Sequence, residues 1–319
     1  MNRSIFVWGF TFLVVTAGCV YGLYWYYRIP PQIVAREEKV DSIAAYKGED
    51  TIQTSDAAAI PAISEPVFES VGVADLYLKE NGEGLDVEID GRHRFYPYQL
   101  LVWHELVNDE FGGEDILITY SPLSEVGMVF DRTVRDQTLE FVTLNRVWNG
   151  TQLFEDTATH SVWSQMLAQS VEGSMQGTGL ARVPSETMTW STWKSLYPNE
   201  KVLSRETGAV RDYTRDPYQT YSNTSTVWYP TGPLDARTAL KTPVVLVTVA
   251  DTRKVYILEN VRQLEHIDDQ VGTVAFRLVY DKASGRVTIE TDSERPIWLD
   301  AGYWFAFAST FPNIELYQP

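Results

Sequence analysis

The 319-residue sequence contains one cysteine, Cys19, and only four histidines. A single cysteine excludes an intrachain disulfide, a zinc site made of several cysteines and a dithiol redox pair. Basic residues are also in the minority, since 26 lysines and arginines stand against 43 acidic residues and the formal net charge is -17. Such a field repels phosphate backbones, so we predict no nucleic-acid partner.

Apolar and aromatic residues, by contrast, are abundant. Hydrophobic residues make up 44% and charged residues 22% of the chain, a balance that supports a buried core in one large domain or two small ones. The aromatic fraction of 13% includes 10 tryptophans and 18 tyrosines, which suit cores and interfaces alike. None of this indicates a reaction, and we predict no cofactor and no metal.

Residues 4–27 contain no charged side chain. As a helix they would measure about 36 Å, at about 1.5 Å per residue, which is enough to cross a bilayer. We predict a single transmembrane helix at 4–27 with residues 1–3 in the cytoplasm, because a short basic N-terminus stays there while a long domain crosses. The chain then belongs to the cytoplasmic (inner) membrane of a prokaryote, with its C-terminal domain extracytoplasmic or periplasmic.

Two other interpretations of this segment stay open. A cleaved signal peptide would also begin with Arg3 and an apolar run, although the run is long and no small-residue cleavage site ends it. The triplet before Cys19 resembles a lipoprotein cleavage box, which leaves lipidation of Cys19 as an alternative. The segment has more aromatic side chains than lipid anchoring needs, which favours packing against another membrane protein or a pigment. These positions are Phe6, Trp8, Phe10, Phe12, Tyr21, Tyr24 and Trp25.

Beyond this anchor the sequence predicts an extended tether and a β-rich domain of the α+β class. Residues 28–64 contain several prolines and lack hydrophobic periodicity, which is typical of a tether. From residue 65 to residue 319, short strand-like runs alternate with turn signals. The predicted strands cover residues 85–89, 116–120, 126–130, 139–144, 244–249, 276–280 and 287–289.

Two helices are predicted in this domain. One begins at Pro97, a residue suited to the first helical position, and has an apolar face formed by Leu100, Trp103, His104 and Val107. His104 is therefore expected to point toward the core. The second helix covers about residues 189–197.

An internal repeat organises the domain. Residues 87–122 align with residues 247–282 without a gap, and the matched pairs follow strand alternation and turn positions. Further on, Trp190 and Trp193 correspond to Trp304 and Phe307. The alternative is chance similarity between β-rich segments.

We therefore predict two pseudo-repeated halves in one extracytoplasmic domain. The first half covers about residues 85–203 and the second about residues 244–317. The second half lacks most of residues 131–182, and this insertion is the expected place for function, because sites lie on loops over a rigid frame.

A series of motifs runs through the domain. They are Gly91-Arg-His-Arg-Phe-Tyr-Pro97, Trp103-His-Glu-Leu-Val-Asn-Asp109, Thr119-Tyr-Ser-Pro-Leu-Ser124, Val129-Phe-Asp-Arg132, Trp163-Ser-Gln165, Gly173, Gly177, Trp190, residues 198–203, Arg211-Asp-Tyr213 and Pro217-Tyr218. In this order they resemble an uncharacterised prokaryotic family, the domain of unknown function 3179. The resemblance covers about residues 65–319 and implies no established activity.

This chain departs from the family at one motif. Members typically read Thr-Tyr-Cys-Pro-Leu-Cys, where this sequence has Ser121-Pro-Leu-Ser124. A Cys-x-x-Cys turn beside a helix that carries a histidine suits a soft metal or thiol-disulfide exchange, because thiolates are the required ligand or nucleophile. Serine does neither at neutral pH. The resemblance therefore implies that this chain has lost the chemistry of those sulfurs.

Polar and aromatic residues near the motifs define a candidate cleft. The candidates are His104, Asp109, Ser121, Ser124, Asp131, Arg132, Trp163 and Gln165. Plainer interpretations stand beside this one, since an apolar helical face favours a core position for His104, and Asp131 with Arg132 is more typical of an ion pair or a turn anchor. No glycine elbow surrounds either serine, which argues against a serine hydrolase.

Two functions remain open. The one that we favour is a non-catalytic accessory or structural subunit of a larger integral-membrane complex, of the respiratory or photosynthetic type, joined through the aromatic anchor. The other subunits of that complex and the lipid bilayer are the expected partners. The alternative is an extracytoplasmic enzyme or a metal- or ligand-binding protein that uses a cleft around His104 and the turn from Ser121 to Ser124.

Overall fold

The computed structural model describes residue 46 and residues 51–53, 60–229, 231–232 and 234–319, which all belong to one compact unit, residues 33–319. The predicted anchor at 4–27, its seven aromatic positions and Cys19 lie outside the described residues, so the membrane predictions stay predictions. Within the part of the chain that is described, no helix is both long enough and apolar enough to cross a membrane.

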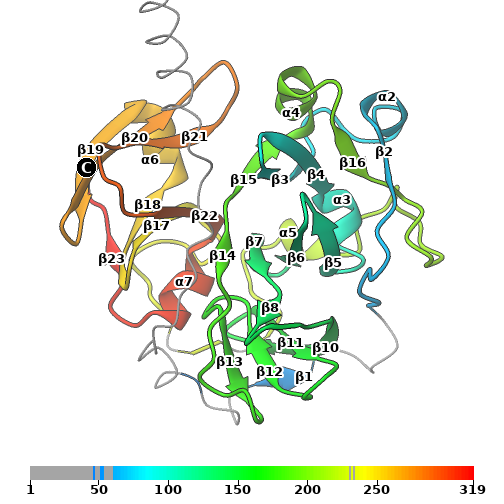
Figure 1. Cartoon of the computed structure of the whole chain (residues 1–319). Helices are drawn as coiled ribbons and strands as arrows, with labels where there is room; N and C mark the ends of the chain where they lie inside the picture. Colours follow the sequence, from blue (N-terminus) through cyan, green and yellow to red (C-terminus); the bar gives the residue numbers. More distant parts are fainter. Residues whose placement is uncertain (1–45, 47–50, 54–59, 230, 233) are drawn as a thin grey trace, which may run out of the picture. The chain divides into compact units, whose positions relative to one another are not determined.

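Strands dominate the described residues, and the helices among them are short (Figure 1). A first block of elements begins with a hairpin of β3 (Glu83–Ile89) and β4 (Arg92–Pro97). Helix α3 (Tyr98–Leu101) then leads into a second hairpin, β5 (Leu106–Phe111) with β6 (Glu114–Ser121). The block is completed by β15 (Ser185–Thr189) antiparallel to β3, by helix α4 (Trp190–Leu196), and by β16 (Lys201–Leu203) parallel to β4.

The same order of elements recurs in a second block toward the C-terminus. A hairpin of β17 (Pro243–Val249) and β18 (Thr252–Ile257) leads through α6 (Leu258–Leu264) into a hairpin of β19 (His266–Val271) and β20 (Val274–Tyr280). The block is completed by β22 (Ile297–Tyr303) antiparallel to β17, by α7 (Trp304–Thr310), and by β23 (Glu315–Leu316) parallel to β18. Val247 pairs with Lys254 as Val87 pairs with Arg94, so the segments that align in sequence also share their register.

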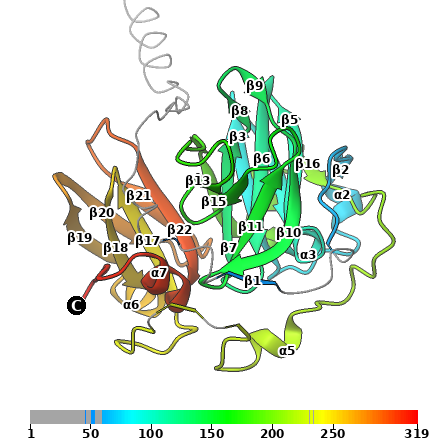
Figure 2. The same ribbon diagram turned by 90° about the horizontal axis from the view of Figure 1, so that it is seen from below.

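Further strands extend the two blocks. β7 (Val126–Asp131) continues the sheet of β5 and β6, and β21 (Val287–Glu290) continues that of β19 and β20. The insertion after β7 forms most of a separate antiparallel sheet of order β1-β10-β11-β12-β13 (Figure 2). The remaining elements are β1 (Ile52–Gln53), β2 (Phe68–Ser70), α2 (Val71–Ala74), β8 (Thr133–Val134), β9 (Gln137–Thr138), β10 (Phe141–Trp148), β11 (Thr151–Asp156), β12 (Val162–Ser164), β13 (Gln169–Glu172), β14 (Arg182–Val183) and α5 (Gln219–Ser222).

The first predicted helix is much shorter than its apolar spacing indicated. Helix α3 ends at Leu101, and Val107 lies in strand β5. Glu105 has a left-handed backbone, with φ 60°, and its N–H donates to the carbonyl of Leu101 at 2.7 Å, which closes the helix end. Pairing of β5 with β6 then outweighs the helical spacing, a non-local effect that periodicity does not report. The predicted helix at 189–197 is confirmed as α4, which is capped by the hydroxyl of Thr189.

The folded domain also extends into the segment predicted as a tether. Ile63 is only 2% exposed, its N–H donates to the carbonyl of Leu106 at 2.9 Å, and its carbonyl accepts from the N–H of Asn108 at 2.8 Å. Strand β1 pairs with β10. Residue 65 is therefore not the start of the packed structure.

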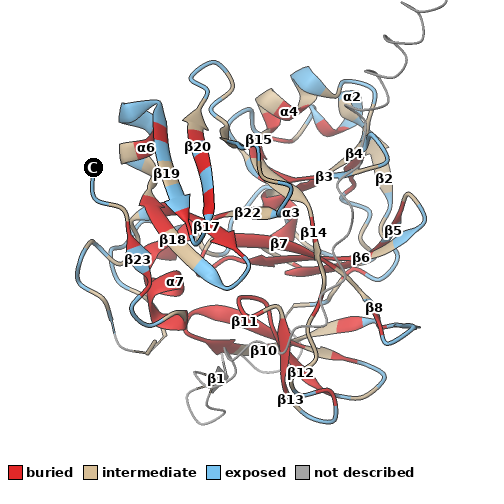
Figure 3. Ribbon diagram, turned by 60° about the vertical axis from the view of Figure 1, so that its left-hand side comes forward, coloured by how far each residue is buried: buried red, intermediate tan, exposed pale blue. Residues whose placement is uncertain are grey.

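Buried residues lie in both blocks and in the insertion (Figure 3). Leu106 of the first block, Trp163 of the insertion and Trp304 of the second block belong to one apolar cluster. Where β22 meets β7, a Cβ on Gly302 would lie 2.5 Å from Cγ2 of Val126, so only glycine allows this approach. The second block thus packs directly against the β6–β7 turn.

Candidate functional site

Asp109 lies in a contact that both blocks share. Its carboxylate pairs with Nη1 of Arg94 at 2.6 Å and accepts from the hydroxyl of Tyr96 at 2.6 Å. In the second block Asp269 pairs with Nζ of Lys254 at 2.9 Å and accepts from the hydroxyl of Tyr256 at 2.9 Å. Because the same contact recurs, its role is to join the two hairpins of each block.

Asp131 and Arg132 are adjacent in sequence and take separate structural partners. Oδ1 of Asp131 accepts from the N–H of Thr133 at 2.7 Å, which anchors a turn. Nη2 of Arg132 pairs with Asp115 at 2.8 Å, and Nη1 donates to the carbonyl of Leu139 at 3.1 Å. In the β5–β6–β7 sheet Asp131 pairs with Ile116, which pairs on its other side with Asp109. Asp131 and Arg132 therefore lie level with Asp109, at the end of the sheet that is far from His104.

The turn between β6 and β7 buries Ser121 and Ser124, which are 1% and 0% exposed. The N–H of Ser124 donates to the carbonyl of Ser121 at 3.2 Å, and the carbonyl of Ser124 accepts from the N–H of Tyr303 at 2.9 Å. The side-chain amide of Gln165 braces the strands on either side, donating to Oγ1 of Thr119 at 3.0 Å and to the carbonyl of Val126 at 2.9 Å. The other oxygen of that amide, Oε1, is buried and has no hydrogen-bond partner among the described residues.

Trp163 and His104 are also held by internal partners. Nε1 of Trp163 donates to Asp156 at 2.8 Å. His104 is fully buried, with Nδ1 2.8 Å from the carbonyl of Pro61 and Nε2 2.7 Å from the hydroxyl of Tyr213. Since a carbonyl only accepts, Nδ1 carries the proton and Nε2 accepts from Tyr213. Burial lowers the pKa of His104, which keeps the ring neutral and leaves neither nitrogen free for a metal.

Six of the eight predicted cleft residues therefore fall into two groups, while Asp131 anchors a turn and Trp163 belongs to the apolar cluster. Ser121, Ser124 and Gln165 gather at the β6–β7 turn, and His104 lies near its start, where the N–H of Tyr120 donates to the carbonyl of Glu105. Asp109 lies three residues into β5 past Leu106, roughly 10 Å along the strand, near Arg132, whose Nε donates to its carbonyl at 3.3 Å. Within the described residues no group of three or more His, Cys, Asp and Glu side chains is placed to hold a metal ion.

A long segment that the motif reading did not single out as a unit covers the turn. Residues 204–229, called the strap from here on, follow β16 and contain only the short helix α5 (Figure 2). Nε2 of Gln99 donates to the carbonyl of Tyr213 at 3.0 Å, and Nε1 of Trp103 donates to the carbonyl of Arg215 at 3.1 Å. With the bond between His104 and Tyr213, these contacts hold the strap against the end of α3.

Glu105 is the titratable residue of this region that sequence reasoning missed. It is 9% exposed, and its Oε1 lies 3.4 Å from the hydroxyl of Tyr218 in the strap. Burial raises the pKa of Glu105 to about 7. Glu265, the aligned residue of the second block, is exposed, and its ion pair with Lys282 at 2.8 Å lowers its pKa. Both residues have a left-handed backbone, but of the two only Glu105 is buried.

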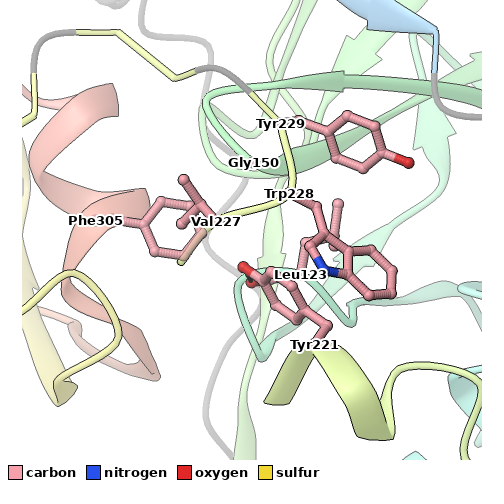
Figure 4. A pocket seen from close by; sticks show the side chains of 7 residues that line it. All are labelled: Leu123, Gly150, Tyr221, Val227, Trp228, Tyr229 and Phe305. Carbon is pink, nitrogen blue, oxygen red and sulfur yellow. Dashed lines mark hydrogen bonds between the residues drawn. The ribbon is translucent and has the colours of Figure 1, made fainter. Parts of the chain in front are cut away.

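An aromatic cluster closes the strap over the turn. The hydroxyl of Tyr221 donates to the carbonyl of Leu123 at 2.7 Å, and Trp228 packs on both Tyr218 and Tyr221. Figure 4 shows the rings of Tyr221 and Trp228 at a narrow apolar pocket, which is lined by Leu123, Gly150, Tyr221, Val227, Trp228, Tyr229 and Phe305. A polar groove of about 440 Å³ lies beside α5, lined by Ser222, Asn223, Thr224, Ser225, Ala239, Lys241, Thr242 and Pro243. None of the eight residues predicted from sequence lines either space.

A family model described as a protein of unknown function, DUF3179, matches residues 57–299. The chain belongs to this family. The matched range covers most of the described domain and begins before residue 65, which agrees with the packing of Ile63. No curated protein and no solved structure matches the chain.

The motifs that resemble DUF3179 proteins lie against one another in this member. The motif that begins at Trp103 holds the two strap motifs, those of Tyr213 and Tyr218, through the bonds described above. The motif of Gln165 braces the strands that flank the turn of Ser121. The spacing of these motifs along the sequence gives no sign of these contacts, because each one joins residues at least 39 positions apart.

Proposed function

We propose that this DUF3179 protein is a non-catalytic accessory or structural subunit of an integral-membrane complex of the respiratory or photosynthetic type. The observation that carries the proposal is the engagement of the predicted cleft residues in the fold itself. Both nitrogens of His104, the carboxylate of Asp109 and the guanidinium of Arg132 all have partners within the domain. Side chains that are held in this way by partners inside the domain stabilise its fold.

The state of the β6–β7 turn supports the same proposal. Ser121 and Ser124 occupy the positions at which the resemblance implies cysteines, and both are buried in the turn. A serine hydroxyl stays protonated at neutral pH, whereas metal binding and thiol exchange need a thiolate. On this proposal the turn retains its packing role after the loss of its sulfur chemistry.

The proposed place is the extracytoplasmic side of a prokaryotic inner membrane, and it rests on the sequence alone. Residues 4–27 are long and apolar enough for a single membrane span, and Arg3 precedes them. The aromatic positions of that segment provide a surface for a neighbouring membrane subunit.

The test is recovery of partner chains with a tagged full-length protein from its native membrane in mild detergent. A matched variant replaces Trp8, Tyr24 and Trp25 by leucine, which keeps the apolar length and removes the aromatic surface. We expect the native chain to bring integral-membrane subunits with it, and the variant to stay in the membrane without them. Equal recovery by both chains would contradict a role for the aromatic anchor.

One observation favours the alternative, a ligand-binding protein or an enzyme around His104 and the Ser121–Ser124 turn. Glu105 adjoins both, and a carboxyl group with a pKa of about 7 suits proton transfer at neutral pH. Metal analysis of the purified protein tests this function. Suppose that the native protein and the Glu265→Gln variant bind metal in a stoichiometric amount and the Glu105→Gln variant does not. This result would favour the metal-binding function over the accessory role.

A further inference from the structure

We propose that the strap is a pH-sensitive lid over the Ser121–Ser124 turn, and that the carboxyl group of Glu105 is the latch to which Tyr218 closes it. This inference does not depend on the proposed function. It concerns a conformational equilibrium of the domain, and an accessory subunit or a ligand-binding protein could use it equally.

The strap is attached in a way that allows local opening. Among the described residues, the backbone–backbone hydrogen bonds of residues 205–229 join strap residues only to one another. The strap is held to the domain by side chains, chiefly those of Gln99, Trp103, His104 and Glu105, and by Tyr221 on the carbonyl of Leu123. Because backbone hydrogen bonds do not tie this segment to the core, its opening costs less free energy than the opening of the sheets that it covers.

Among the described residues Glu105 faces no cation that would stabilise its charge, and only the hydrogen bond from Tyr218 lowers its pKa. From the strap it meets the hydroxyl of Tyr218, with Tyr229 and Asp216 beyond that ring. From β6 and β11 it is met by the N–H of Tyr120 and the amide of Gln152, which both donate to its backbone carbonyl. On its own element the neighbour is neutral His104, beyond which Arg211 acts on the ring. The closed strap thus surrounds the carboxyl group with neutral or acidic groups.

Ionisation of Glu105 therefore favours the open strap. In the closed state the neutral carboxyl group is the stable form, because burial disfavours the carboxylate. When the strap opens, water reaches the carboxylate and the group returns toward its ordinary pKa of 4.5. The opening equilibrium then rises with pH from about 4.5 to about 7 and levels off above that range. Opening uncovers the carbonyl of Leu123 and the apolar pocket beside it.

The test is hydrogen exchange of the full-length chain between pH 5 and pH 8, corrected for the intrinsic dependence of exchange on pH. We expect the opening equilibrium of strap peptides within residues 213–229 to rise on the order of 100-fold over this range. Peptides from α6, the helix that precedes Glu265 in the second block, should show no such rise. A strap whose corrected protection does not change with pH would overturn the proposal without any variant.

Three variants separate the latch from general effects on stability. Glu105→Gln keeps the shape of the neutral side chain and should remove the pH dependence of strap opening. Glu265→Gln, at the aligned exposed position, should leave it unchanged. Tyr218→Phe removes the hydroxyl and keeps the ring, so the strap should open a few times more often at every pH with the pH dependence retained. A pH dependence that survives in Glu105→Gln would refute Glu105 as the latch.

Discussion

Replacement of Glu105 by glutamine is expected to stabilise the protein, and to do so only above acidic pH. The pKa of this carboxyl group is about 7 in the folded chain, against an ordinary value of 4.5. As the pH rises, the unfolded chain loses this proton first, so the folded state loses stability between about pH 4.5 and pH 7 and no further above that range. A difference of about 2.5 pKa units corresponds to a cost of about 3 kcal/mol at pH 8.

Glutamine cannot ionise, so the variant avoids this cost. Urea denaturation of the full-length chain in detergent, followed by tryptophan fluorescence at pH 4, 6 and 8, measures the difference. We expect Glu105→Gln to equal the native chain at pH 4 and to exceed it by up to about 3 kcal/mol at pH 8. Glu265→Gln, which removes an exposed ion pair, should show no such gain. The same difference at pH 4 and pH 8 would refute the reasoning, because a packing effect does not follow the titration of one carboxyl group.

Four other predictions concern individual residues of the domain. Gly302→Ala should lower the free energy of unfolding in urea by about 1–3 kcal/mol, because its Cβ would lie 2.5 Å from Val126. Gly72→Ala in α2, where a Cβ would meet open space, should leave the stability unchanged or raise it. Asp109→Ala should lower the free energy of unfolding by about 3–5 kcal/mol, because it leaves Arg94 without its buried partner. Asp269→Ala should lower it less, because Lys254 keeps its ion pair with Glu315. Equal losses in the two variants would contradict this difference. In an NMR titration, the pKa of His104 should lie below 6.5 because the ring is buried. The pKa of His93 should lie above 6.5, because burial lowers it by less than Asp86 raises it. A chain that begins at residue 65 should unfold at lower urea than one that begins at residue 46, because it loses buried Ile63 and the carbonyl of Pro61 that holds His104; identical midpoints would place residues 60–63 outside the core.

Strand positions and the repeat were accessible from the sequence because they rest on local patterns. The apolar run at residues 244–249 and the alternation along residues 276–280 predict β17 and β20, and the gap-free alignment matches the shared register of Val87 with Arg94 and Val247 with Lys254. The error at α3 has a non-local cause. The apolar spacing from Leu100 to Val107 fits a helix, but β5 pairs with β6, and this pairing decides the structure of the segment.

The candidate site was only partly accessible for the same reason. Burial of His104 followed from its place among apolar residues, but its partners, Pro61 and Tyr213, lie 43 and 109 residues away. Glu105 was missed because its sequence neighbours do not distinguish it from Glu265, and the difference between them comes from the strap.

Native mass spectrometry of the full-length protein, extracted from its native cells in mild detergent, tests the proposed accessory role most directly. We expect a defined assembly in which this chain accompanies integral-membrane subunits at a fixed ratio. Recovery of the chain as a free monomer, at a detergent concentration that leaves other membrane complexes intact, would contradict it.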